Sequence, residues 1–161
     1  MRYFVAACVL GVIALSCHNE NELESYVPLN LMEYGVPLTI LAPDSAEVKT
    51  MDMGFMKDVT VKKDPDYYVQ IYASEATTRD VAKVLAEQLA EVKNGRYFKA
   101  IVREEPAGFI YQTAVDSSNT NYGFRYVRIQ GDNEFIFQTG LIGTFTLDEV
   151  ERMYKAVQGT E

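Results

Sequence analysis

Few residues of this sequence are of the types that most often carry catalysis. Its 161 residues include one histidine, His18, and two cysteines, Cys8 and Cys17. A Ser–His or Cys–His pair needs a base that a packed scaffold holds within hydrogen-bond reach of the nucleophile. His18 does not supply one, because it lies in a segment that is expected, as argued below, to be a flexible tether. The same counts exclude zinc and iron sites built from several histidines or cysteines. We therefore expect a protein that is not an enzyme and that carries no metal and no cofactor.

Paired carboxylates are the remaining groups that could carry out acid–base catalysis, provided that the fold holds two of them at a fixed separation. The candidates are Glu104 with Glu105, Asp64 with Asp66, and Asp52. Neighbouring carboxylates at strand ends are usually solvated turn residues, so this interpretation is favoured over catalysis. The run 116–121 is rich in oxygen ligands, but it lacks the Gly and the distal Glu of an EF-hand calcium loop and is interpreted as a polar hairpin loop.

The first 16 residues have the pattern of an export signal. Arg2 precedes an apolar run, 3–15, that is interrupted by nothing more polar than Cys8 and Gly11. At 1.5 Å per residue this run spans about 20 Å, which is short of the roughly 30 Å hydrocarbon core of a bilayer. A positive start, a short apolar stretch and small residues at the cleavage point are typical of a signal that is removed from the mature protein. We expect cleavage after Ser16.

Residues 13–17, Ile-Ala-Leu-Ser-Cys, resemble a bacterial lipobox. The resemblance implies that Cys17 becomes the new N-terminus and receives a diacylglycerol thioether. The segment departs from the usual pattern because Leu15 stands at −2 and Ala14 at −3, and Ala14 with Ser16 also meets the small-x-small rule of an ordinary secretory signal. Cys17 favours the lipoprotein, since it would otherwise be a lone thiol in an oxidising compartment. An ordinary secreted protein and an uncleaved single-span anchor are the alternatives.

The polar segment behind Cys17 predicts a tether. Residues 17–25 are expected to be the lipidated N-terminus and tether, with alternating Glu20, Glu22 and Glu24, and residues 26–161 to be a single domain, because no second linker or repeat follows. Acidic residues behind a lipidated cysteine resemble the surface-export signals of Bacteroidetes lipoproteins. We expect lipid on Cys17 to anchor the protein to the bacterial outer membrane, facing either the periplasm or the cell surface.

Composition excludes several classes of protein. The chain is 48% hydrophobic and 24% charged, which is ordinary for a globular domain and unlike a disordered tail or a polytopic membrane protein. Its 15 Lys and Arg against 23 Asp and Glu give a formal net charge of −8. Charge neutralisation of phosphates needs a positive surface, so we expect no nucleic-acid partner. The oligomeric state does not follow from the sequence.

The first of two expected helices has an apolar face that recurs at helical spacing from Val81 to Val92. Thr77 is expected to cap its start. Asn94-Gly95 is expected to end it with a residue in the left-handed conformation.

The second expected helix begins with a capping box at Thr146 and Glu149. Phe145 and Val150 are placed to form the hydrophobic staple that accompanies such a start, and Gly159 follows the last apolar residue. The pattern predicts a terminal amphipathic helix that docks on the core.

The remaining segments alternate with period two, as strands do. The expected strands are Pro37–Leu41, Glu47–Met51, Lys57–Lys63, Tyr67–Ala73, Tyr97–Arg103, Phe109–Val115, Tyr122–Gln130 and Glu134–Thr139. Gly131-Asp132 has the composition of a two-residue hairpin turn with a positive φ at the glycine. Most connections are too short for parallel crossovers, so we expect class α+β: an antiparallel sheet of about six to eight strands with two amphipathic helices packed on it.

The order of these elements resembles the PsbP-like fold. The resemblance covers residues 34–158 and rests on the opening segment 35–43, a strand meander, a central helix, a second meander and a C-terminal helix introduced by Phe145-Thr146. The group includes the photosystem extrinsic protein, the Ran-binding Mog protein and DcrB-type bacterial lipoproteins, and it implies an accessory role. The Trp that often follows the first strand in that group is absent, because the chain has no Trp.

Tyr68 and Tyr72 alternate with Val69 and Ile71, so the two tyrosines are expected to share one face of their strand. Tyr combines a rigid apolar body with a polar tip, which suits binding surfaces and half-buried sheet faces alike. The second helix is expected to cover this face. If no helix covers it, Tyr68 and Tyr72 mark a site for a partner or ligand.

Ser45 lies in an Asp-Ser-Ala run that matches the short O-glycosylation pattern of Bacteroidetes. An ordinary turn after Pro43 is the favoured interpretation, and glycosylation of Ser45 is the alternative.

Three functions fit these observations. The favoured one is a membrane-anchored exported lipoprotein whose domain binds or supports another envelope protein without catalysis. The first alternative is a periplasmic carrier or sensor for a small apolar ligand held between sheet and helices. The second is a carboxylate-dependent hydrolase with two acidic side chains in one pocket.

Overall fold

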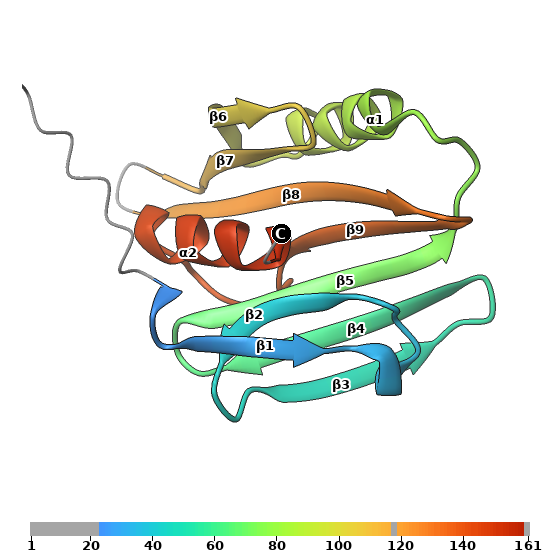
Figure 1. Ribbon diagram of the computed structural model, residues 1–161. Helices are drawn as coiled ribbons and strands as arrows, with labels where there is room; N and C mark the ends of the chain where they lie inside the picture. The colour runs from blue at the N-terminus through green and yellow to red at the C-terminus, as the bar shows by residue number, and fades with distance from the viewer. Residues whose placement is uncertain (1–22, 117–118, 160–161) are drawn as a thin grey trace, which may run out of the picture.

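The computed structural model describes residues 23–116 and 119–159. Within these ranges the strands are β1 (Tyr26–Asn30), β2 (Thr39–Pro43), β3 (Glu47–Asp52), β4 (Met56–Lys63), β5 (Tyr67–Glu75), β6 (Phe98–Glu105), β7 (Gly108–Ala114), β8 (Thr120–Gln130) and β9 (Asn133–Thr139). The α-helices are α1 (Val81–Lys93) and α2 (Leu147–Gln158), and a 3-10 turn, η2 (Met32–Tyr34), joins β1 to β2. Figure 1 shows the arrangement of these elements.

Seven strands form one antiparallel sheet in the order β3-β4-β5-β9-β8-β7-β6. β1 and β2 form a separate two-stranded antiparallel sheet. The expected α+β class is therefore confirmed, with antiparallel pairing and two helices. The β8–β9 hairpin turns at Gly131, whose φ of 62° is the positive value that the sequence predicted.

The first strand, β1, was not predicted, because Pro28 and Asn30 interrupt the alternation of apolar residues in 26–30. It is an edge strand that pairs only with β2 among the described residues, and an edge tolerates a proline that donates no ladder hydrogen bond. β2 begins at Thr39, two residues after the expected Pro37.

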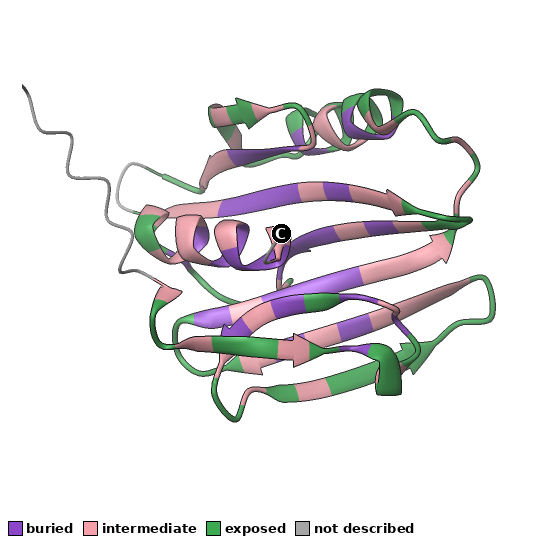
Figure 2. Ribbon diagram, in the orientation of Figure 1, coloured by how far each residue is buried: buried purple, intermediate pink, exposed green. Residues whose placement is uncertain are grey.

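One face of the large sheet is covered by α2 and the β1–β2 hairpin, which lie in front of it in Figure 1. The main apolar cluster joins all three layers. It contains Leu31, Val36, Leu38 and Ile40 from the hairpin and its loop, Val59, Val61, Val69, Ile71 and Phe137 from the sheet, and Val150, Met153, Tyr154 and Val157 from α2. In Figure 2 the buried residues of α2, β2 and the central strands meet in this layer.

The opposite face is covered in part by α1, which packs against β8. Its Val84, Leu85 and Val92 share a second apolar cluster with Phe109 of β7 and Val127 of β8. This confirms the predicted apolar face of α1.

The expected N-cap of α1 was wrong, whereas the helix ends at Asn94-Gly95 as expected but without a left-handed residue there. The N-cap is Asp80, whose Oδ1 accepts a hydrogen bond from Lys83 N at 3.1 Å. A carboxylate at this position satisfies a free amide and faces the positive end of the helix dipole, so the helix starts at Val81 and Thr77 lies outside it. At the other end Asn94 has right-handed angles (φ −78°), and Gly95 is not among the residues with positive φ.

The start of α2 has the predicted capping box. Thr146 Oγ1 accepts a hydrogen bond from Glu149 N at 3.3 Å, and Glu149 Oε2 accepts one from Thr146 N at 2.7 Å. Phe145 and Val150 are both buried in the main cluster, as a hydrophobic staple requires. Gly159, at φ 79°, follows the last turn.

The expected signal segment 1–16, Cys17 and His18 lie outside the described residues. None of the helices in the described ranges combines the length and apolarity that a membrane crossing needs.

Candidate functional site

The side of the large sheet that faces away from α2 carries a row of polar side chains. Residues alternate between faces along a strand, so Tyr72 and Gln70 of β5 point away from Val69 and Ile71. Their cross-strand neighbours on the same face include Asp58 and Thr60 of β4 and Ile136 and Gln138 of β9. We call this surface the open face and define it as Asp58, Thr60, Tyr68, Gln70, Tyr72, Ile136 and Gln138.

Hydrogen bonds link the open face across three strands. Gln70 Nε2 donates to Asp58 Oδ2 at 2.7 Å, and Gln138 Nε2 donates to Gln70 Oε1 at 3.0 Å and to the Tyr72 hydroxyl at 3.5 Å. Gln70 and Gln138 are buried although the face is polar, and Asp58 Oδ1 is buried with no hydrogen-bond partner within residues 23–116 and 119–159. Burial raises the pKa of the Tyr72 hydroxyl, and the Asp58 carboxylate raises it further, so the hydroxyl that accepts from Gln138 stays protonated at physiological pH.

Tyr68 and Tyr72 therefore occupy the face of β5 opposite the α2 layer, although the sequence favoured a helix over them. The Tyr68 ring lies directly over Gly140, where a Cβ would come within 2.2 Å of the ring. Lys62 Nζ lies 5.3 Å from the centroid of the same ring. Both tyrosines are half-buried and lie beside polar groups.

Arg125 of β8 continues the same cross-strand row. It lies opposite Gln138 in the β8–β9 ladder, with 9% of the residue exposed. Its guanidinium lies over the Tyr111 ring, 5.9 Å from the centroid. Gly123, opposite Tyr111, provides the space for that ring, because a Cβ there would lie 2.7 Å from the ring atoms.

The Arg125 guanidinium has loose partners among the described residues. Arg125 NH1 donates to the Phe124 carbonyl at 3.5 Å, and Arg125 NH2 lies 3.8 Å from Glu91 Oε1 of α1. Nε is buried without a hydrogen-bond partner. A guanidinium carries five N–H donors and strongly prefers bidentate acceptors, so this arginine has unused capacity for an anion.

Two cavities flank Arg125 and share Tyr111 and Thr113 as lining residues. The first has a volume of about 160 Å³ and reaches Asn121, Gln138 and the glycines of the segment after β9. The second has a volume of about 270 Å³ and lies between the end of α1 and β6, where Arg96 and Phe98 line it. We call Arg125, Tyr111, Thr113, Gln138 and the two cavities the Arg125 site.

Exposed apolar side chains surround the Arg125 site. Leu141 is 74% exposed and Ile142 is 80% exposed, and both belong to the segment that links β9 to α2. Tyr97 lines the second cavity and is 44% exposed. Asn121 holds the linking segment in place, because its Oδ1 accepts a hydrogen bond from Phe145 N at 2.7 Å and its Nδ2 donates to the Gly143 carbonyl at 3.3 Å.

Among the candidate catalytic carboxylates, Asp64 and Asp66 line one cavity, whereas Glu104, Glu105 and Asp52 do not line it. Glu104 is exposed and lies on the opposite face of β6 from Glu105, which accepts a hydrogen bond from Tyr154. Asp66 lines a cavity of about 380 Å³ beside the β4–β5 turn, together with Asp64 and Arg152 but with neither glutamate. Asp52 accepts a hydrogen bond from Gly54 N in the β3–β4 turn.

The other expected sites lie in turns. Asp116 accepts two hydrogen bonds from Asn119 at 3.0 and 2.7 Å, as in a hairpin loop. Ser45 is exposed in the β2–β3 turn with a φ of 60°, and nothing in the structure tests its glycosylation. Within residues 23–116 and 119–159, no three histidine, cysteine or carboxylate side chains lie together as metal ligands would.

Comparisons of the chain with protein-family models, with curated proteins and with solved structures found no match. Function is therefore inferred from the chemistry of the open face and the Arg125 site.

Proposed function

We propose that the protein is an exported lipoprotein, anchored to the bacterial outer membrane by lipid on Cys17, whose single domain binds another envelope component without catalysis. A PsbP-like fold is part of the proposal. The observed order of meander, α1, second meander and α2 supports it, and that group mostly serves accessory roles.

The open face is the observation that carries the binding role. Tyr72, Asp58 and Thr60 are half-buried polar residues on the side of the sheet that α2 leaves uncovered. Leu141, which is largely exposed, lines the first cavity of the Arg125 site on the same side. Exposed apolar residues next to buried polar ones are typical of interaction sites. Tyr68 and Tyr72 are proposed to contact the partner.

The two helices favour this role over a carrier of apolar ligands. Both pack on the sheet through contiguous clusters of buried side chains, and a ligand between sheet and helix would have to displace them. Asp64 and Asp66 share one cavity, but both are exposed residues of the β4–β5 turn. Neighbouring carboxylates in an exposed turn are usually solvated, so binding is favoured over carboxylate-dependent hydrolysis.

Membrane fractionation with mass analysis tests the anchoring. We expect the wild-type chain in the membrane fraction with the mass of a lipidated protein cut before Cys17, and Cys17→Ser in the soluble fraction or as uncut precursor. Cys8→Ser is the matched control, because Cys8 leaves with the signal and its loss should change nothing. A wild-type protein that is soluble and bare of lipid, or an uncut wild-type precursor in the membrane, contradicts the proposal.

A further inference from the structure

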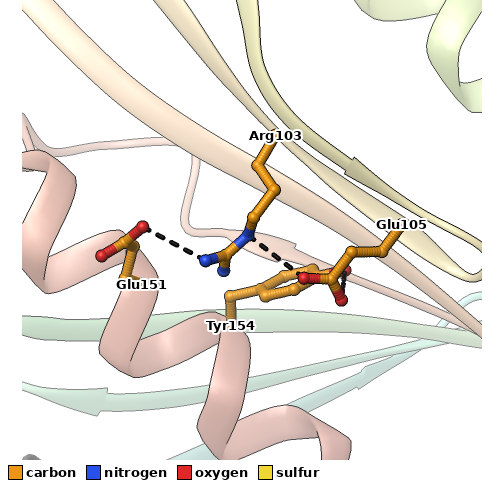
Figure 3. Close-up of polar contacts among 4 residues, drawn as sticks. All are labelled: Arg103, Glu105, Glu151 and Tyr154. Atoms are coloured by element: carbon orange, nitrogen blue, oxygen red, sulfur yellow. Dashed lines mark hydrogen bonds and ion pairs between the residues drawn. The ribbon is translucent and has the colours of Figure 1, made fainter. Parts of the chain in front are cut away.

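Arg103 has a structural role, and its ion pairs and burial can be compared with those of Arg125. Arg103 of β6 lies on the α2 side of the sheet, with its guanidinium 5.3 Å from the centroid of the Tyr154 ring. Its Nε forms an ion pair with Glu105 Oε1 at 3.1 Å but makes no hydrogen bond within the described residues, and its NH1 donates a hydrogen bond to Glu151 Oε1 at 3.3 Å (Figure 3). Tyr154 also donates a hydrogen bond to Glu105 Oε2 at 3.1 Å, so the aromatic ring, the cation and the two carboxylates form one compact cluster.

Arg125 is more deeply buried than Arg103 but has weaker compensation. The side chain of Arg125 is 11% exposed and that of Arg103 is 34% exposed. Arg103 has two carboxylates within 3.3 Å, whereas the one carboxylate paired with Arg125 in the described part of the chain is that of Glu91, at 3.8 Å and 66% exposed. Burial makes an incompletely paired charge more unfavourable. If both arginines served stability alone, the more buried Arg125 would be expected to have the closer carboxylates.

We propose that Arg125 binds the carboxylate of a ligand that carries an apolar body, an assignment that rests on the binding role proposed above and names the ligand class. The planar guanidinium fork matches a carboxylate in a bidentate pair. The ring of Tyr111 supports one face of the guanidinium, and Gly123 allows that ring to lie flat against β8.

The size of the first cavity limits what enters it. A volume of about 160 Å³ is well below the roughly 300–1,000 Å³ of pockets that hold drug-sized ligands. The cavity therefore takes the carboxylate head of a ligand and little more. Leu141 lines this cavity and is largely exposed, so it is placed to contact the apolar body.

The Glu91 carboxylate would compete with the ligand carboxylate for the Arg125 guanidinium. The Glu91 carboxylate is the anion nearest to Arg125 NH2, and its exposure lets it move into solvent when a second carboxylate arrives. Removing its charge takes away a like-charge repulsion against the incoming ligand. Glu91→Gln is therefore expected to tighten binding by about threefold.

Calorimetric titration of the full chain in a nonionic detergent tests this proposal. The probes are N-acetyl-leucyl-leucine, which ends in a peptide carboxylate, its C-terminal amide, and octanoate. Arg125→Met removes the charge and keeps an apolar stem, Arg125→Lys keeps the charge without the fork, and Arg103→Met is the matched control on the other side of the sheet. Circular dichroism confirms that each variant is folded.

We expect at least one free carboxylate to bind wild type and Arg103→Met equally, and to bind Arg125→Met at least about tenfold more weakly, with Arg125→Lys between them. Stronger binding of the peptide acid identifies a protein C-terminus as the source, and stronger binding of octanoate identifies a fatty acid. Equal binding of acid and amide, unchanged binding by Arg125→Met, or no binding of either acid at millimolar concentration overturns the proposal. The titration does not require a membrane, so it is independent of whether Cys17 carries lipid.

Discussion

Replacing Arg103 by methionine and replacing Arg125 by methionine should have different effects on the free energy of unfolding. Arg103→Met leaves the carboxylates of Glu105 and Glu151 without their cation, and both are only about one-third exposed, at 39% and 31%. Each of the two ion pairs is partly exposed to solvent, and such a pair contributes about 1 kcal/mol to stability. The cation–π contact with Tyr154 contributes about 0.5–1 kcal/mol. We expect the free energy of unfolding to fall by about 2–3 kcal/mol.

Arg125→Met removes a buried charge whose nearest anion, Glu91, is well solvated and needs no replacement partner. Methionine keeps the apolar contacts of the arginine stem, and replacing a poorly compensated buried charge by an apolar group is often neutral or stabilising. We expect the free energy of unfolding to stay within about 1 kcal/mol of wild type, or to rise.

Urea denaturation followed by circular dichroism measures both changes. With an m value of about 2 kcal/mol/M, the midpoint of Arg103→Met should fall by about 1–1.5 M and that of Arg125→Met should change by no more than about 0.5 M. If Arg125→Met lost more than about 2 kcal/mol, Arg125 would be a structural residue and the reasoning that reserves it for a ligand would be refuted.

Three further variants test local features of the fold. Thr146→Ala removes the capping box of α2 and should lower the free energy of unfolding by about 1–2 kcal/mol in the same urea assay, whereas an unchanged midpoint would mean that the cap contributes nothing. Gly123→Ala places a Cβ 2.7 Å from the Tyr111 ring and should lower stability by about 1–3 kcal/mol and weaken carboxylate binding; a variant with wild-type stability and affinity would show that the ring moves freely. Burial and then the Glu87 carboxylate raise the pKa of Glu134, so its ionised form opposes folding above that pKa and the penalty disappears as pH falls through it. Glu134→Gln should therefore be more stable than wild type at neutral pH and lose that advantage in thermal melts on acidification, and a constant difference across pH would contradict the assignment.

Local signals were sufficient to predict most elements of the fold. The capping box and staple of α2 involve residues within one helical turn, so the sequence alone placed its start at Thr146. Alternating patterns located the seven strands of the large sheet to within about two residues at most ends. The start of α1 was misplaced because Thr77 and Asp80 are both good capping residues, and only the structure shows which side chain meets a free amide.

Pairings between distant segments could not be predicted in the same way. The alternation of β5 placed Tyr68 and Tyr72 on one face, but it could not tell which helix covers that face, since α2 reaches β5 only through the tertiary fold. The Arg125 site was missed altogether. Its one local signal is an arginine between Phe124 and Tyr126 in a strand, and its burial depends on α1 and on Gln138 of β9.

Photo-cross-linking in cells that produce the protein tests most directly whether the domain binds its partner beside Arg125. A photoreactive phenylalanine analogue replaces Leu141, which is 74% exposed at the Arg125 site, or Phe55, which is 78% exposed in the β3–β4 turn and serves as the matched control. We predict an adduct to an envelope component from position 141 that Arg125→Met abolishes, and none from position 55. An adduct from position 55 alone, or equal adducts that persist in Arg125→Met, would contradict the account.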